Sequence, residues 1–203
     1  MGSVLPSSRE RRKLRPTPPP LRSPTYPLSH RLFRLLWLSV WTLLASWTPP
    51  PLHAWRRGLV RLFGGKIAPT AEIYASVRIW YPPNVEMGDH SCLGPGVDCY
   101  SVARIVLGPG ALVSQRAYLC AGTHDISDPN FSLVARPITI GPQAWVAAEA
   151  FVGPGVTVGE GAVLGARGVA VRDLQAWSVY GGNPARRLKA RSRLSQEDGE
   201  PKA

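Results

Sequence analysis

The sequence predicts a mainly β protein, a parallel β-helix of six-residue repeats, with a helical segment before it and a short helix after it. Three observations predict this class. An aliphatic residue or Ala recurs every six positions over roughly residues 67–175, with one clear interruption between His124 and Ile138. Residues 31–63 carry helical patterns that stop where the repeat begins. The 203 residues suffice for one domain with appendages, and 44% hydrophobic content excludes wholesale disorder.

The repeat is clearest over residues 140–175. Six consecutive units open with an aliphatic residue or Ala, at Ile140, Val146, Val152, Val158, Leu164 and Ala170. The same frame fits Leu107, Val113 and Leu119, fits Ile67, Ile73, Ile79 and Val85 loosely, and continues at Met87, Leu93 and Cys99 after a two-residue slip. A period of six is neither the two of a strand nor the 3.6 of a helix. It predicts a coil with flat faces, in which each turn buries its aliphatic residues against neighbouring turns.

The first 66 residues have three parts. Residues 1–30 are rich in Pro, Arg and Ser, so they cannot bury enough apolar surface to offset their ordering entropy, and we expect a disordered basic arm. A targeting segment is the alternative, although the apolar core and cleavage site of a secretory signal are missing. Residues 31–48 and 52–63 are predicted helices within a helical segment, residues 31–66. This segment either docks on the body of the protein or lies on a membrane surface, and the two are compatible.

Two details refine the helical segment. The uncharged run from Leu35 to Trp47 is shorter than the roughly 20 residues that a bilayer span needs. In residues 52–63 we expect the apolar residues on one face and the arginines largely elsewhere, as suits a membrane surface; the apolar residues are Leu52, Trp55, Leu59 and Leu62.

The net charge of +11 belongs to the amino-terminal third. Residues 1–66 hold twelve Lys and Arg against the single acid Glu10, whereas residues 67–203 hold twelve of each sign. No nucleic-acid-reading module accompanies the positive charge, so we expect no nucleic-acid partner. The charge instead favours an anionic membrane face, which predicts a cytoplasmic protein at the inner face of the membrane.

Three stretches carry a family resemblance: THDISDP at 123–129, PITIGPQAWVAAEAFVGPGVTVGEGAVLGA at 137–166, and GGNPARRLK at 181–189. The chain resembles the hexapeptide-repeat acyltransferases, most of all the colanic-acid-type sugar O-acetyltransferases and more distantly the galactoside, maltose and nodulation acetyltransferases. The resemblance implies a left-handed parallel β-helix over residues 67–176, interrupted by a loop at 125–137. It also implies a turn, a short basic helix and a tail over residues 177–203, and assembly as a homotrimer with active sites between subunits.

His124 is the candidate catalytic residue because it opens the polar interruption of the repeat, and loops on rigid scaffolds commonly carry function. A neutral imidazole can take a proton from a hydroxyl. The resemblance implies acetyl-CoA as the donor and a hydroxyl of a sugar or glycoconjugate as the acceptor, with direct transfer between them. It also assigns the oxyanion donor to the backbone N–H of Ala148. A carboxylate should orient the imidazole, and Asp125 and Glu149 are both candidates.

The resemblance assigns a further set of residues to acetyl-CoA: Trp145, Ala147, Ala148, Ala166, Arg172, Arg186 and Lys189. Arg186 and Lys189 are three residues apart, so on the predicted short helix they would share a face and hold the phosphates. Arg187 would then point to solvent. The acceptor is less clearly encoded: Asp98, Tyr100 and Ser101 lie about one coil before His124 and are candidates to face it.

Three alternatives compete with this interpretation. Cys92, Cys99 and Cys120 invite a covalent acyl-enzyme, but they occupy repeat positions where small residues pack. The γ-class carbonic anhydrases share the repeat but need three zinc-binding His, and only His90 and His124 fall in the coil, so we expect no metal site. A non-catalytic β-solenoid that acts as a scaffold or regulatory binding subunit is the alternative from another class.

Overall fold

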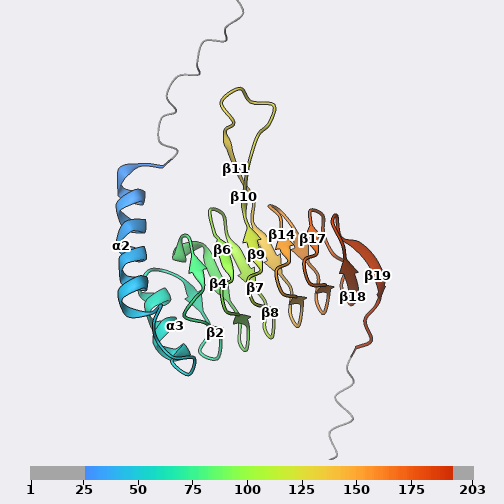
Figure 1. Cartoon of the computed structure of the whole chain (residues 1–203), viewed down its shortest axis with the longest axis horizontal. Coiled ribbons are helices and arrows are strands. Elements are labelled where there is room, and N and C mark those ends of the chain that lie inside the picture. Colours follow the sequence, from blue (N-terminus) through green and yellow to red (C-terminus); the bar gives the residue numbers. More distant parts are fainter. Residues whose placement is uncertain (1–25, 194–203) are drawn as a thin grey trace, which may run out of the picture.

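The computed structural model describes residues 26–193, as two helices followed by a parallel β-solenoid (Figure 1). Helix α2 (Leu28–Leu44) stands beside the first turns of the solenoid, and α3 (His53–Leu62) lies across its amino-terminal end. The predicted arm falls outside the described residues up to position 25, and α2 begins three residues before the predicted position 31. The parallel β-solenoid itself is confirmed.

The strands stack into three faces. The first face contains β1 (Lys66–Ile67), β4 (Val85–Met87), β7 (Ile105–Leu107), β12 (Ile138–Ile140) and β15 (Thr157–Val158). The second contains β2 (Glu72–Ile73), β5 (Cys92–Leu93), β8 (Leu112–Val113), β13 (Trp145–Val146), β16 (Val163–Leu164), β18 (Ser178–Gly181) and β19 (Arg186–Ala190). The third contains β3 (Arg78–Ile79), β6 (Asp98–Tyr100), β9 (Tyr118–Cys120), β14 (Phe151–Val152) and β17 (Val169–Ala170).

The interior explains the period of six. Each strand sends its aliphatic residue inward, where it stacks on its equivalent in the next turn: Val113 pairs with Val146, and Val146 with Leu164. The small residues of the fifth place are buried at the corners, among them Ala111, Ala117, Ala144, Ala150 and Ala162. A larger side chain at such a corner would overpack the interior.

Turn length divides the solenoid into two halves. In the carboxy-terminal half Ile140 pairs with Val158, a spacing of 18 residues, which is three units of six. In the amino-terminal half Ile67 pairs with Met87, a spacing of 20. The extra residues fall at the corner between the third and first faces, where the first turn contains the 3-10 helix η1 (Pro82–Asn84). The two-residue slip in the repeat is therefore a real insertion.

The same corner is enlarged in the next two turns. Met87 pairs with Leu107, again 20 residues apart, because two extra residues lie between β6 and β7. In the third turn a hairpin of β10 (Gly122–His124) and β11 (Leu133–Ala135) leaves the solenoid (Figure 1). The sequence analysis recognised the slip before Met87 and this last interruption, but it missed the second insertion and placed the start of the third after His124. The excursion already begins at β10, so His124 lies inside the hairpin rather than before it.

Helix α2 docks on the first turns through aromatic side chains. Trp37 and Trp41 are buried, and the indole N–H of Trp37 donates to the carbonyl of Ile79 at 2.7 Å. Trp37 also packs against Phe63 with ring centroids 5.1 Å apart. Docking on the body, one of the two predicted modes for residues 31–63, is therefore present in the structure.

The arginines of α3 cap the first turn of the solenoid. Arg56, fully buried, donates to the carbonyl of Ile73 at 2.5 Å and to the carbonyls of Pro49 and Pro50. Arg57 donates to Ala71, and Arg61 to Ile67. The end turn of a solenoid leaves carbonyl groups without a neighbouring turn, and these guanidinium groups satisfy them.

The arginines of α3 do lie away from the expected apolar face of residues 52–63, but they are bonded to backbone carbonyls, and one apolar residue of that face, Leu59, is buried beside Arg56. Leu52, Trp55 and Leu62 are exposed, and the buried face carries Arg56 with Leu59 and Val60. Part of the positive charge of the amino-terminal third thus serves backbone capping. Burial lowers the pKa of Arg56, because the charged form loses water.

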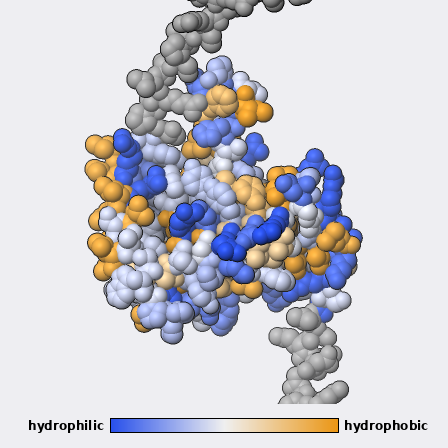
Figure 2. All heavy atoms as spheres, viewed as in Figure 1, coloured by the Kyte–Doolittle hydropathy of each residue, from blue (hydrophilic) through white to orange (hydrophobic). Residues whose placement is uncertain are grey.

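The outer side of α2 is apolar and exposed. Residues three, four or seven apart share a helix face, and this one carries an exposed row that we call the leucine stripe: Leu28, Leu32, Leu35, Leu36 and Leu43. Figure 2 shows hydrophobic side chains along this outer edge of the molecule. Within residues 26–193 no helix is both long and apolar enough to cross a bilayer.

The predicted short helix at residues 186–190 is wrong, because the structure has the strand β19 there. It pairs antiparallel with β18, and Arg186 lies opposite Gly181 while Lys189 lies opposite Val179. An unpaired β18 would expose a row of backbone donors and acceptors at the end of the solenoid, and β19 satisfies them. The solenoid also extends through β18, beyond the predicted boundary at residue 176.

Candidate active site

The hairpin holds the imidazole of His124 in a defined state. His124 is exposed at the end of β10, opposite Leu133 of β11. Its Nδ1 lies 2.5 Å from the carbonyl oxygen of Phe131, and a carbonyl can only accept, so Nδ1 carries the proton. The tautomer that remains leaves Nε2 unprotonated. A ring with one nitrogen held by a backbone carbonyl has the arrangement that a general base needs.

Neither predicted carboxylate orients this ring within the chain. Asp125 accepts from the backbone N–H of Ser127 at 2.8 Å, which closes the turn at the start of the loop. Glu149 pairs with Arg116 at 2.5 Å and with Arg167 at 2.6 Å. These hydrogen bonds and charges, that of Arg167 first, lower the pKa of Glu149. The Phe131 carbonyl takes the orienting position, which a sequence motif cannot reveal because any residue supplies a carbonyl.

A cavity of about 340 Å³ lies between the hairpin and α2. It is lined by Tyr26, Arg31, Arg34, Trp80, Tyr100, His124 and Leu133. Trp80 and Tyr100 come from the ends of the first and second turns, at the corner that the insertions enlarge. Their ring centroids are 5.6 Å apart. Stacked insertions at one corner therefore build the wall beside His124.

The three residues predicted to contact the acceptor substrate lie in different environments. Tyr100 is half-buried and lines the cavity with His124. Ser101 is fully buried, and its hydroxyl accepts from the N–H of Tyr81 and donates to the Tyr81 carbonyl. It ties the first insertion to the second and has no access to an acceptor. Asp98 is paired with Arg78 at 2.5 Å and lines a neighbouring cavity that does not include His124.

Arg31, Arg34 and Trp80 were missed by the sequence analysis. The guanidinium of Arg34 lies 3.8 Å from the centre of the Trp80 ring, a cation–π contact. Burial lowers the pKa of Arg34. The two-residue slip before Met87 was the available signal for Trp80, because an insertion beside a repeat places extra side chains outside the coil. Nothing local marks Arg34, since its role depends on where α2 docks.

The backbone N–H of Ala148 is free in the described chain. Its carbonyl accepts from Arg167, but no hydrogen bond from its N–H is present within residues 26–193. The solenoid does not need a donor at this corner position, and Pro, which lacks an N–H, fills the equivalent place in five other units, at Pro69, Pro95, Pro109, Pro142 and Pro154. Ala148 is thus a corner residue whose N–H has no acceptor within residues 26–193.

The predicted cofactor residues lie around the second face. Trp145 on β13 is 42% exposed, and its indole N–H donates to Ser114 at 2.8 Å. Ala147 is buried, and Ala166, stacked one turn beyond Ala148, is exposed. His124 leaves the corner between the third and first faces, and none of the described cavities is lined by both His124 and Trp145. Within residues 26–193, His124 and Trp145 therefore lie at different places on the solenoid.

A third group gathers near the carboxy-terminal end. Arg172, Arg186 and Arg187 line one cavity of about 300 Å³. Lys189 is exposed and does not line it. The predicted pairing of Arg186 with Lys189 on a helix face is wrong, because both residues lie on the strand β19. Arg187 is exposed, as expected, although it also lines this cavity. Arg187 also donates to the hydroxyl of Ser178 at 3.1 Å.

The cysteines favour packing over catalysis. Cys99 is fully buried, and burial raises its thiol pKa. Burial likewise raises the pKa of Cys92 to about 11. A thiol that stays protonated at neutral pH is a poor nucleophile. Within residues 26–193 no three His, Cys, Asp or Glu side chains are grouped as a metal site would require.

A solenoid of hexapeptide turns with a histidine hairpin defines a class of acyl-transferring proteins, and comparison with known proteins places the chain within it. Over 150 residues the chain is 42% identical to the colanic acid biosynthesis acetyltransferase WcaF of Escherichia coli K12, covering 74% of this chain and 82% of that protein. It is 23% identical to the galactoside O-acetyltransferase of the same organism, over 66% of this chain and 68% of that protein. No protein-family model matches the chain.

Among solved structures, a maltose O-acetyltransferase from Clostridium difficile 630 superposes with a TM-score of 0.73 at 20% identity, covering 82% of this chain and 90% of that one. The hexapeptide-repeat acetyltransferase VCA0836 of Vibrio cholerae, solved with acetyl-CoA, gives the same TM-score at 20% identity, over 85% and 94%. These structures share the fold. The chain belongs to the hexapeptide-repeat acetyltransferases, in the branch that contains the colanic acid biosynthesis acetyltransferase.

Proposed function

We propose that this protein transfers an acetyl group from acetyl-CoA directly to a sugar hydroxyl in polysaccharide or glycoconjugate biosynthesis, with His124 as the general base. The observation that carries the proposal is the hydrogen bond from Nδ1 of His124 to the Phe131 carbonyl. In the neutral ring it leaves Nε2 as a proton acceptor, and the His124 side chain lines a cavity of about 340 Å³ beside α2 and one of about 370 Å³ on the hairpin. Nε2 takes the hydroxyl proton as the oxygen attacks the thioester carbonyl, and CoA leaves as the thiol.

The tetrahedral oxyanion requires a fixed donor, and the free N–H of Ala148 supports that assignment. One such donor is worth ~3 kcal/mol of transition-state stabilisation. Trp145, Ala147 and Ala166 would contact the pantetheine arm. Arg172 and Arg186 would hold the CoA phosphates, and Arg187 from the same cavity joins them. The relatives' names point to acetyl transfer and to a sugar-containing acceptor.

The site is proposed to form between subunits of a homotrimer. His124 and Trp145 lie on different parts of the solenoid, so a second copy of the chain has to bring its Trp145 and Ala148 to the His124 of the first. Sedimentation at working concentration should give a trimer. A monomer with full activity would overturn this part of the proposal.

Peripheral contact with a membrane is proposed for the leucine stripe. Five exposed leucines on one side of α2, with the exposed Trp47 and Trp55 beyond it, match the composition of interfacial helices. This contact would keep the enzyme at the cytoplasmic face of the membrane. Cosedimentation with anionic vesicles should fall when Leu32 and Leu36 are both replaced by Glu. Unchanged vesicle binding in this variant would contradict the proposal.

The experiment that tests the catalytic proposal measures CoA thiol release. The full chain is incubated with acetyl-CoA and a panel of free sugars, glycosides and glycolipids, and the products are weighed by mass spectrometry. A mass gain of one acetyl group on one acceptor class, together with stoichiometric thiol release, is the expected result. Binding of the sugars without any thiol release would favour the non-catalytic scaffold.

A further inference from the structure

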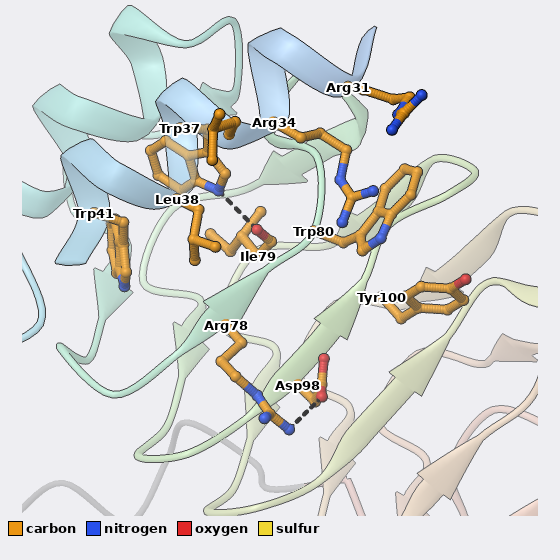
Figure 3. Close-up of a pocket in the computed structure, with 11 residues that line it drawn as sticks. Arg31, Arg34, Trp37, Leu38, Trp41, Arg78, Ile79, Trp80, Asp98 and Tyr100 are labelled. Carbon is orange, nitrogen blue, oxygen red and sulfur yellow. Dashed lines mark hydrogen bonds and ion pairs between the residues drawn. The ribbon is translucent and has the colours of Figure 1, made fainter. Parts of the chain in front are cut away.

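The cavity beside His124 adjoins a second one along α2. The second cavity, of about 500 Å³, is lined by Arg31, Arg34, Leu35, Trp37, Leu38, Trp41, Arg78, Ile79, Trp80, Asp98 and Tyr100 (Figure 3). Four of these residues also line the first cavity: Arg31, Arg34, Trp80 and Tyr100. The two cavities therefore share a wall, and we name the pair the α2 trough.

The order of side chains along the α2 trough changes from polar to apolar. His124 stands at one end, and the aromatic rings of Tyr100 and Trp80 follow. The guanidinium groups of Arg34 and Arg31 come next, projecting from α2 toward Trp80 and Tyr100 (Figure 3). Leu35, Leu38 and Trp41 line the far part. The α2 trough thus offers a proton acceptor, a stacking surface, a pair of cations and an aliphatic surface.

The two cations have no counter-ion in the described chain. Three arginines and one aspartate line the second cavity, and that aspartate, Asp98, is paired with Arg78. Neither Arg31 nor Arg34 forms an ion pair within residues 26–193. Moreover, Nε of Arg34 is buried without a hydrogen-bond partner. A buried donor on a charged group is costly to leave unpaired, so an anionic ligand would satisfy it.

The apolar end of the trough meets the leucine stripe. Leu35 belongs to both, and Leu38, one turn of helix on from Arg34, lines the same cavity. Both leucines are about 60% exposed, at 61% and 62%. An apolar chain lying in the trough could therefore pass directly into the membrane on which the stripe is proposed to rest.

We propose that the α2 trough binds an acceptor in which a phosphate or diphosphate joins the sugar to a long apolar chain. The sugar would stack on Trp80 and Tyr100 with a hydroxyl at Nε2 of His124. Its phosphate would accept from Arg34 and Arg31, and the apolar chain would follow Leu35 and Leu38. The inference rests on the proposed function, because it names the acceptor of the same site.

The first test measures binding without catalysis. The full chain is titrated with geranylgeranyl diphosphate, inorganic diphosphate and an uncharged alkyl glycoside, with Trp80 as a fluorescent reporter. We expect geranylgeranyl diphosphate to bind, and Arg31→Ala with Arg34→Ala to weaken it by at least about tenfold. Inorganic diphosphate binding equally well, or the uncharged glycoside binding equally well, would overturn the proposal.

Matched variants separate charge from hydrophobicity. Lys66→Ala removes a cation from β1, outside the trough, and should leave geranylgeranyl diphosphate binding unchanged. Leu35→Gln with Leu38→Gln should weaken geranylgeranyl diphosphate by at least about fivefold and leave inorganic diphosphate unaffected. If Lys66→Ala weakened geranylgeranyl diphosphate binding as much as the Arg31 and Arg34 variant does, the effect would come from overall charge. That result would contradict binding in the α2 trough.

The second test uses turnover and keeps the two proposals apart. The acceptors are a sugar carried on a long-chain diphosphate, the same sugar as a nucleotide diphosphate, and its methyl glycoside. We expect the lowest KM for the lipid form, and a rise in that KM alone in the Arg31 and Arg34 variant. If the methyl glycoside or the nucleotide sugar were turned over with an equal KM, the proposal that the α2 trough binds a lipid-linked acceptor would be wrong. The proposed acetyl transfer would still stand. No thiol release with any acceptor, despite lipid diphosphate binding, would sink the proposed function instead.

Discussion

The two halves of the solenoid differ in regularity, and the difference separates two tasks. The carboxy-terminal turns keep the 18-residue spacing and present backbone groups at their corners, such as the free N–H of Ala148. The amino-terminal turns have insertions at one corner, and α2 packs beside them. Regular turns suit a cofactor with an extended arm, since they repeat the same small corner. Irregular turns build the cavity in which we propose that the acceptor binds.

The largest expected effect tests the irregular half at His124. His124→Ala should lower kcat by at least ~10² with acetyl-CoA affinity preserved, because the proton acceptor is lost while the cofactor contacts remain. CoA thiol release gives kcat, and calorimetry with acetyl-CoA gives the affinity. His90→Asn is the matched control, since His90 lies on an exposed turn with a φ of 55° that Asn tolerates. Full turnover in the His124 variant would remove it as the base.

A second prediction concerns how the amino-terminal half is closed. Arg56→Met should lower the free energy of unfolding by about 2 kcal/mol, because the carbonyls of Ile73, Pro49 and Pro50 lose a buried donor. Urea denaturation followed by tryptophan fluorescence measures the change. Arg57→Met removes a half-buried donor to one carbonyl and should cost clearly less. Equal losses would mean that charge, rather than the buried cap, stabilises α3.

The next prediction tests the regular half at the cavity lined by Arg172, Arg186 and Arg187. Arg172→Ala with Arg186→Ala should raise the KM for acetyl-CoA about tenfold with little change in kcat, because the phosphates lie far from the reacting carbonyl. Lys189→Ala, which leaves the cavity untouched, is the control and should behave as the unaltered protein. If Lys189→Ala raised the KM for acetyl-CoA more than the double variant did, the CoA phosphates would not bind in this cavity.

The smallest effect has the opposite sign. Gly58 lies inside α3 on its exposed side, and a Cβ there would meet nothing within 4 Å. Gly58→Ala should stabilise the protein by about 0.5–1 kcal/mol, because Ala restricts the unfolded chain without a clash. Gly161→Ala is the contrast in the regular half: φ is +61° and the new Cβ would lie 2.6 Å from the Trp177 ring. Thermal denaturation should show a gain in the first variant and a loss in the second.

The site residues were predicted from two different kinds of signal. His124 was chosen because it lies where the repeat is interrupted, whereas Trp145 and the corner alanines were assigned from the family resemblance, and these roles stay predictions. Asp125 accepts a hydrogen bond from Ser127 in its own loop, whereas Glu149 and Ser101 are held by residues of other turns, Arg116 with Arg167 and Tyr81, which no local spacing records. The helix at Arg186 was predicted from the GGNPARRLK stretch, and the exposed edge of β18 imposed a strand instead.

The sequence by itself determined the solenoid, because a buried aliphatic residue and a small corner residue every six positions satisfy one backbone geometry. It also determined that the positive surplus lies before Lys66. Only the tertiary structure decided what that charge does. Arg56, Arg57 and Arg61 cap carbonyls of the first turn and the segment before it, whereas Arg34 meets Trp80 in the trough. A guanidinium's partner depends on where its helix docks, and docking is a long-range contact that no local spacing records.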